Sequence, residues 1–71
     1  MPREVPISGK TIRLGQLLKF AGVLDAGGEA KALLANGTVT VNGEPEQRRG
    51  RQLAAGDLVR VGELELRVVA P

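Results

Sequence analysis

Residues 37–43, with the sequence Gly-Thr-Val-Thr-Val-Asn-Gly, constrain the fold of this chain more than any other segment. Val39 and Val41 alternate with threonines, a pattern typical of a half-buried strand. Asn42-Gly43 is a strong hairpin signal, because both central positions of the preferred two-residue turn need a positive φ. The segment therefore predicts a β-hairpin with one half-buried strand.

A first helix is expected before this hairpin. Its apolar residues follow the i, i+3, i+4, i+7 spacing of one helical face: Leu14, Leu17, Leu18 and Ala21. Gly22 is a natural end, because glycine adopts the left-handed conformation at low cost. Lys19 falls roughly opposite the apolar stripe. We expect Phe20, the only aromatic residue, to be partly buried in this helix.

A second helix is expected between Asp25 and Gly37. Asp25 can cap it by accepting a hydrogen bond from a free backbone N–H, and Glu29 lies near the first turn, where the helix dipole favours an anion. The apolar side of this helix consists of Ala30, Leu33 and Leu34.

Extended segments are expected at both ends of the chain. Residues 5–14 predict either a short hairpin or an extended segment, and Pro45 interrupts the return strand of the Asn-Gly hairpin. Residues 54–57 predict a turn before the last two strands, residues 58–61 and 64–68. We expect an exposed edge strand near the C-terminus, which could pair with another strand.

Composition bounds the chemistry and the number of domains. The chain has 71 residues, so we expect one domain over residues 1–71. It contains no Cys and no His, which removes disulfides, thiolate or imidazole metal sites, and the usual general base. We therefore expect no metal and no cofactor. No segment of the size of a catalytic domain is present, so we also expect no enzymatic activity. Because no apolar run or signal peptide is evident, we expect a cytoplasmic protein without membrane contact. We also expect a monomer.

A basic cluster follows the hairpin. Residues 47–56 contain Arg48, Arg49 and Arg51 and no acid, whereas residues 1–46 contain five basic and five acidic residues. Arginine presents a rigid fork of donors that matches two phosphate oxygens at once. With no acid within these ten residues, the cluster predicts a positive loop that faces an anionic partner.

Four motifs follow one another along the chain: Leu14-x-x-Leu17-Leu18, Glu29-Ala30-Lys31-Ala32-Leu33-Leu34, Gly37-x-Val39-x-Val41-Asn42-Gly43 and Gly56-Asp57-x-Val59. This pattern resembles the S-four RNA-binding domain, a family named for a ribosomal small-subunit protein. The segments 18–22 and 27–31, together with Arg48-Arg49, are similar to the small stand-alone bacterial members of that family.

The resemblance implies an α+β fold, the alpha-L motif, with two short helices packed on a small, mostly antiparallel sheet. It implies a non-catalytic protein that binds structured RNA, either ribosomal or transfer RNA, and that could associate with ribosomal particles. Family members commonly carry Ser-Arg where this chain has Ala26-Gly27, so one expected phosphate contact is missing. The predicted RNA-binding residues are Lys19, Lys31, Arg48, Arg49 and Arg51.

The shortage of aromatic residues indicates how RNA would be bound. Single-stranded RNA binders use aromatic side chains on which bases stack. We therefore expect contacts to phosphates and to helical shape, with little direct reading of bases.

Other interpretations remain open. The arginine cluster could be an ordinary solvated loop, Lys31 could pair with acids on its own helix, and Lys19 could only form a polar helix face. In another class, sulfur-carrier β-grasp proteins share residues 41–44 and the Gly56-Asp57-x-Val59 motif. Such carriers need a Gly-Gly C-terminus, and this chain ends Val-Val-Ala-Pro. An adaptor that binds another protein is the alternative function.

Overall fold

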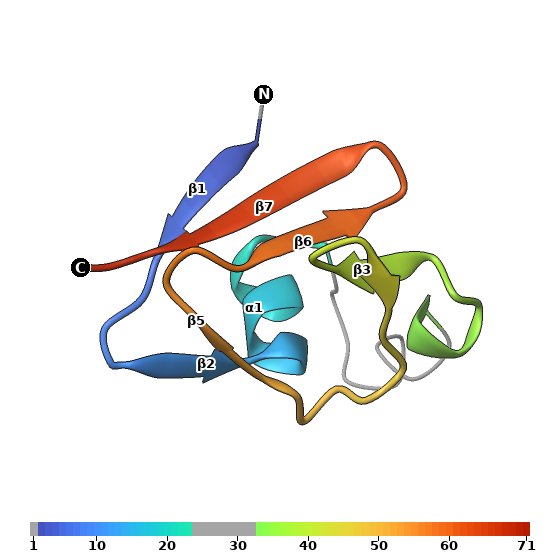
Figure 1. The fold of residues 1–71 in the computed structure, drawn as a ribbon, viewed down its shortest axis with the longest axis horizontal. Helices are drawn as coiled ribbons and strands as arrows, with labels where there is room; N and C mark the ends of the chain where they lie inside the picture. The colour runs from blue at the N-terminus through green and yellow to red at the C-terminus, as the bar shows by residue number, and fades with distance from the viewer. Residues whose placement is uncertain (1, 24–32) are drawn as a thin grey trace.

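The computed structural model describes residues 2–23 and 33–71 (Figure 1). Residues 33–35 are helical, and Gly37 follows with a φ of 70°. The remaining elements in the described ranges are β1 (Arg3–Pro6), β2 (Thr11–Arg13), α1 (Leu14–Phe20), β3 (Val39–Val41), β4 (Glu44–Pro45), β5 (Gln52–Ala54), β6 (Leu58–Val61) and β7 (Leu64–Val69). Among these residues, no helix is long and apolar enough to cross a membrane.

The main sheet is mixed and has the strand order β1-β7-β6-β3-β4, while β2 and β5 form a separate pair. Only β1 and β7 are parallel among the described pairings, so the mostly antiparallel sheet implied by the family resemblance is confirmed. The hairpin predicted as one alternative for residues 5–14 is wrong, because β1 pairs with β7 and β2 pairs with β5.

The expected edge strand near the C-terminus is also wrong. β7 lies between β1 and β6, as Figure 1 shows, because the N-terminal strand returns to cover it. The edges of this sheet are β1 and the two-residue strand β4. The strand predicted over residues 64–68 is present as Leu64–Val69, but its pairing depends on residues at the far end of the chain.

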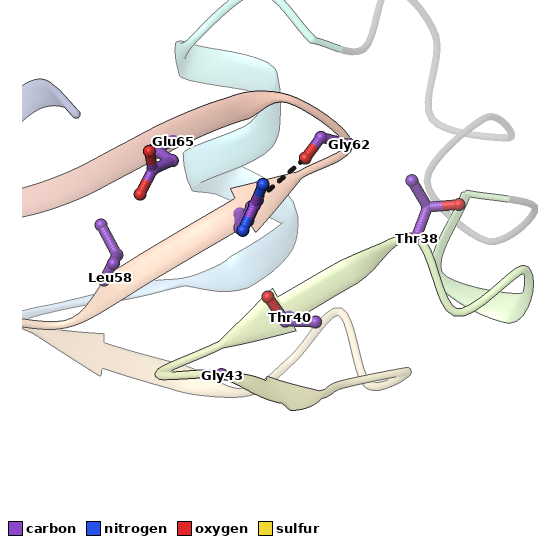
Figure 2. A pocket seen from close by; sticks show the side chains of 7 residues that line it. Thr38, Thr40, Gly43, Leu58, Gly62 and Glu65 are labelled. Carbon is purple, nitrogen blue, oxygen red and sulfur yellow. Dashed lines mark hydrogen bonds between the residues drawn. The ribbon is translucent and has the colours of Figure 1, made fainter. Parts of the chain in front are cut away.

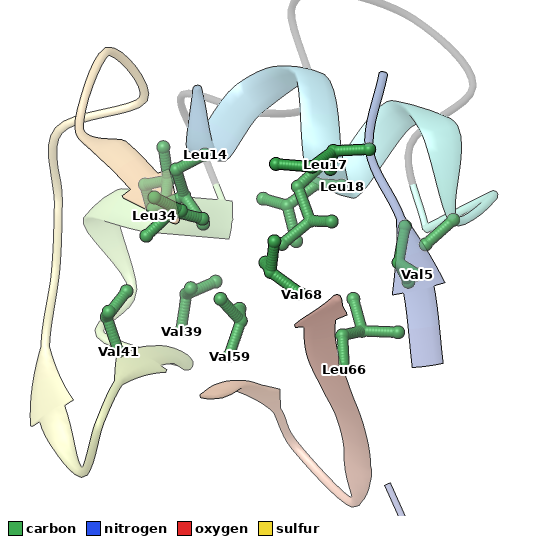
Figure 3. Close-up of a cluster of buried hydrophobic side chains, with 13 residues drawn as sticks. Val5, Leu14, Leu17, Leu18, Leu34, Val39, Val41, Val59, Leu66 and Val68 are labelled. Atoms are coloured by element: carbon green, nitrogen blue, oxygen red, sulfur yellow. The ribbon is translucent and has the colours of Figure 1, made fainter. Parts of the chain in front are cut away.

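The core lies between α1 and one face of the main sheet (Figure 3). Leu14, Leu17 and Leu18 of α1 are each 0% exposed, which confirms the predicted apolar stripe. In the strands, alternate residues point toward the helix: Val5, Val39, Val41, Val59, Leu66 and Val68. Leu33 packs against this cluster and is only half-buried, whereas Leu34 is buried.

The Asn-Gly turn is formed as predicted and is tied to the following turn. Asn42 has a φ of 52° and Gly43 a φ of 87°. The Asn42 Nδ2 donates to Oδ1 of Asp57 at 3.2 Å, and the Asn42 Oδ1 accepts from the Leu58 N–H at 3.0 Å. Asp57 Oδ2 in turn accepts from the Ala54 N–H at 2.9 Å. The Val-Asn-Gly and Gly-Asp-x-Val motifs therefore hold each other in place.

Replacing Asn42 with alanine should lower the free energy of unfolding by about 2 kcal/mol, because the side-chain hydrogen bonds are lost and alanine disfavours a positive φ. Asn42→Gly accepts the backbone conformation and should cost about 1 kcal/mol. Urea unfolding followed by circular dichroism measures both values. Equal stability of the alanine variant and the wild type would show that this turn contributes nothing.

Candidate nucleic-acid interface

The arginine loop, residues 47–51, is fixed to the first turn of α1 by its main chain. The Leu14 N–H donates to the Arg51 carbonyl and the Gly15 N–H donates to the Arg49 carbonyl, each at 2.8 Å. The first N–H groups of a helix have no partner within the helix, so these carbonyls satisfy two of them. The loop therefore packs on the helix end instead of extending into solvent.

Gly15 allows this close approach. A Cβ at Gly15 would lie 3.3 Å from the Arg49 Cβ and 3.4 Å from the Arg49 carbonyl oxygen. A larger side chain would displace the loop or the helix. Glycine lowers the stability of a helix, so helix stability does not explain Gly15. The close contact between Gly15 and Arg49 does explain it.

Glu46 lies beneath the loop and is 7% exposed. Its carboxylate accepts hydrogen bonds from the Gln47 N–H at 3.1 Å and from the Arg48 N–H at 3.2 Å. It also accepts from Arg48 Nε at 3.3 Å and from Arg51 Nη1 at 2.9 Å. One buried carboxylate thus contacts both the main chain and two guanidinium groups of the loop.

The prediction that the arginines are unopposed by nearby acids is therefore wrong. Glu46 immediately precedes the basic segment, residues 47–56. The comparison of charges therefore placed Glu46 among the acids of residues 1–46 and not with the arginines. Its N–H donates to the Val39 carbonyl at 3.1 Å, which continues the pairing of β3 and β4 and fixes the backbone before the loop. This backbone contact is not visible in the local charge pattern.

The hydrogen bonds to Glu46 lower its pKa from 4.5 to about 2. The largest cause is the Arg51 side chain, followed by the N–H and then the side chain of Arg48, while desolvation acts in the opposite direction. A carboxyl group whose pKa is lowered by folding stabilises the folded state at pH values above the pKa that the group has in the unfolded chain. That contribution is lost as the pH falls from about 4.5 toward 2.

Replacing Glu46 with glutamine should therefore make stability less dependent on pH in this range, because the variant has no carboxylate to protonate. The free energy of unfolding of the wild type should fall more steeply than that of Glu46→Gln between pH 4.5 and 2. Urea unfolding at several pH values provides the measurement. Glu63→Gln, at an exposed position, is the matched control and should keep the wild-type profile. Parallel profiles for wild type and Glu46→Gln would contradict the pKa assignment.

The carboxylate neutralises only part of the loop. Three guanidinium groups and one carboxylate leave residues 46–51 with a net charge of +2. The Arg48 side chain is 80% exposed although it is paired, and the Arg51 side chain is 34% exposed. Each uses one nitrogen toward Glu46, so the other donors of each fork can bind a second acceptor. Arg49 is exposed and has no ion pair within the described residues.

Lys19 lies on the same side of α1 as the contact with the arginine loop. It follows Gly15 by four residues, and positions i and i+4 are neighbours on a helix surface. Helical side chains lean toward the N-terminus, so Lys19 leans toward the end of α1 where Arg49 packs. Its exposure confirms the predicted polar position. Lys31, Asp25 and Glu29 lie outside the described residues.

Arg13 was missed by sequence reasoning. It is exposed, directly precedes α1, and pairs across β2 and β5 with Gln52, the neighbour of Arg51. The pairing of these distant strands, together with the hydrogen bond from the Leu14 N–H to the Arg51 carbonyl, brings Arg13 to the arginine loop. In the sequence, Arg13 is recognisable only as a basic residue immediately before the predicted helix. That position alone does not distinguish Arg13 from the other scattered basic residues as an RNA contact.

The opposite face of the main sheet has a different character. A shallow pocket lies over β3, β6 and β7, with Thr40, Leu58 and Glu65 among its lining residues (Figure 2). Arg60 also lines this pocket, pairs across the strands with Glu65, and donates from Nε to the Gly62 carbonyl at 3.1 Å. Among the described residues, no group of acidic side chains could hold a metal ion. In this pocket Arg60 lies beside the acidic Glu65, whereas residues 46–51 have a net charge of +2. The arginine loop is therefore the better candidate for binding an anionic ligand.

Comparison with known proteins identifies the class of this domain. Residues 5–69 match the family model described as S4 domain, so the chain belongs to the S4 domain family. It is 46% identical over 61 residues to a protein of Bacillus subtilis (strain 168) named "Probable ribosome maturation protein RlbA". The match covers 86% of each chain. The resemblance to small stand-alone members of this family is therefore confirmed.

Proposed function

We propose that this protein is a non-catalytic RNA-binding protein that contacts ribosomal RNA through the arginine loop and the adjacent face of α1. The observation that carries the proposal is the fixed loop, which Glu46 and two main-chain hydrogen bonds hold in place while Arg48 remains exposed. Two findings favour ribosomal RNA over transfer RNA. The chain belongs to the S4 domain family, and the name of its Bacillus subtilis relative refers to ribosome maturation.

The fixed loop lowers the cost of binding. Ordering a flexible side chain or loop at an interface costs free energy, and a loop that is already ordered avoids part of that cost. Guanidinium forks can then bind phosphate oxygens in pairs, and Lys19 adds a point charge one helical turn away. The proposed contact residues are Lys19, Lys31, Arg48, Arg49 and Arg51. We add Arg13 to them because it is exposed and pairs with Gln52 beside the arginine loop.

Recognition through these residues depends mainly on where phosphates lie. Phosphate contacts set position and orientation but carry no base sequence directly. A folded RNA presents phosphates at fixed spacings, whereas a flexible strand must be ordered first. The proposal therefore assigns the protein to structured ribosomal RNA, within a ribosomal particle in the cytoplasm.

Cross-linking in cells, followed by sequencing of the attached RNA, tests this function. The proposal predicts that ribosomal RNA dominates the cross-linked material, with a focused set of positions. Alanine substitution of both Arg48 and Arg49 should reduce that signal. The adaptor alternative predicts instead a protein partner that is recovered after nuclease treatment, with no RNA cross-linked to this chain.

A further inference from the structure

Phe20 is the only aromatic residue of the chain and is 68% exposed. The expectation that it is partly buried is wrong, because Leu14, Leu17 and Leu18 already form the buried side of α1. Phe20 follows Gln16 by four residues, and both lie on the exposed side of the helix. The aromatic ring is therefore presented to solvent.

One basic residue lies next to Phe20 on α1. This neighbour, Lys19, is exposed. Lys19 lies one helical turn after Gly15, the residue of α1 that Arg49 contacts. Leu64, the other large apolar residue exposed in the described ranges, is 38% exposed and begins β7.

We propose that Phe20 and Lys19 form a binding site for one unpaired nucleotide of the RNA. The phenyl ring stacks on the base, and the ammonium group of Lys19 contacts a phosphate beside it. Every base has a π-face, so this contact selects an unpaired nucleotide without selecting its sequence. The inference rests on the proposed function and adds a base contact at the far end of α1 from the arginine loop.

Two RNA hairpins test this site: one with a fully paired stem and one with a single bulged nucleotide in the same stem. Wild-type protein should bind the bulged hairpin about tenfold more tightly, the magnitude expected for one base–aromatic stack. Phe20→Ala should lose this preference and keep the wild-type affinity for the paired hairpin. Leu64→Ala is the matched control, and it should keep both affinities.

Phe20→Trp gives a second, independent measurement, because the chain has no other tryptophan and no tyrosine. Its fluorescence should be quenched by the bulged hairpin more strongly than by the paired one. Phe20→Ala with an undiminished preference, or equal quenching by both hairpins, would overturn the nucleotide site alone. Failure of the wild-type protein to bind either hairpin would overturn both the site and the proposed function.

Discussion

Alanine at both Arg48 and Arg49 should weaken binding to a folded ribosomal RNA fragment by about a hundredfold. A hydrogen bond to a charged group contributes about 1.5 kcal/mol or more, and each 1.4 kcal/mol is about a factor of ten in affinity. Arg51 is left in place because its contact with Glu46, at 2.9 Å, is shorter than that of Arg48, at 3.3 Å, and its side chain is less exposed. Fluorescence anisotropy with a labelled RNA fragment measures the loss, and circular dichroism confirms that the double variant is folded.

The matched control carries the same change of charge on the opposite face of the sheet. Arg60 and Arg67 are exposed residues of β6 and β7, and each alternates with buried residues that face the core. Arg60→Ala with Arg67→Ala should reduce affinity much less than the loop variant. Equal losses for the two double variants would mean that net charge, and not the arginine loop, determines binding.

The second large effect concerns stability. Leu17→Ala should lower the free energy of unfolding by about 2–5 kcal/mol, because the side chain is lost from a closed core and leaves a cavity. Leu17 is 0% exposed at the centre of α1. A chain of 71 residues has a total stability of only about 4–11 kcal/mol at typical values per residue. The variant should therefore unfold at a clearly lower temperature than the wild type, as thermal denaturation would show.

Lys19→Ala is the appropriate control for stability, because it lies two residues away on the exposed face of the same helix. A surface change of this kind should alter the free energy of unfolding by no more than about 0.5 kcal/mol. A Leu17 variant as stable as the Lys19 variant would be inconsistent with α1 packing on the sheet.

Local patterns predicted the elements of this fold well. The leucine spacing identified α1, the alternating valines identified β3, and Asn42-Gly43 identified a turn whose two residues have positive φ. Each of these signals depends on residues within a few positions of one another. The family motifs extend this information, since they imply how such elements are arranged.

Contacts between residues that are far apart in the sequence could not be predicted from such local patterns. The parallel pairing of β1 with β7 joins the two ends of the chain. The contact of the arginine loop with α1 brings Gly15 to Arg49, and only the fold reveals it. Glu46 was counted as an N-terminal acid because nothing in its neighbours shows that its side chain turns inward beneath the loop.

The dependence of RNA affinity on salt tests the central claim most directly, namely that a fixed arginine loop contacts phosphates. For four or five contacts, log affinity should fall against log salt with a slope of roughly −3 to −5. Alanine at Arg48 and Arg49 should make this slope shallower by about 1.5, since two contacts are removed. A wild-type slope near zero, or the same slope in the wild type and the double variant, would contradict the claim.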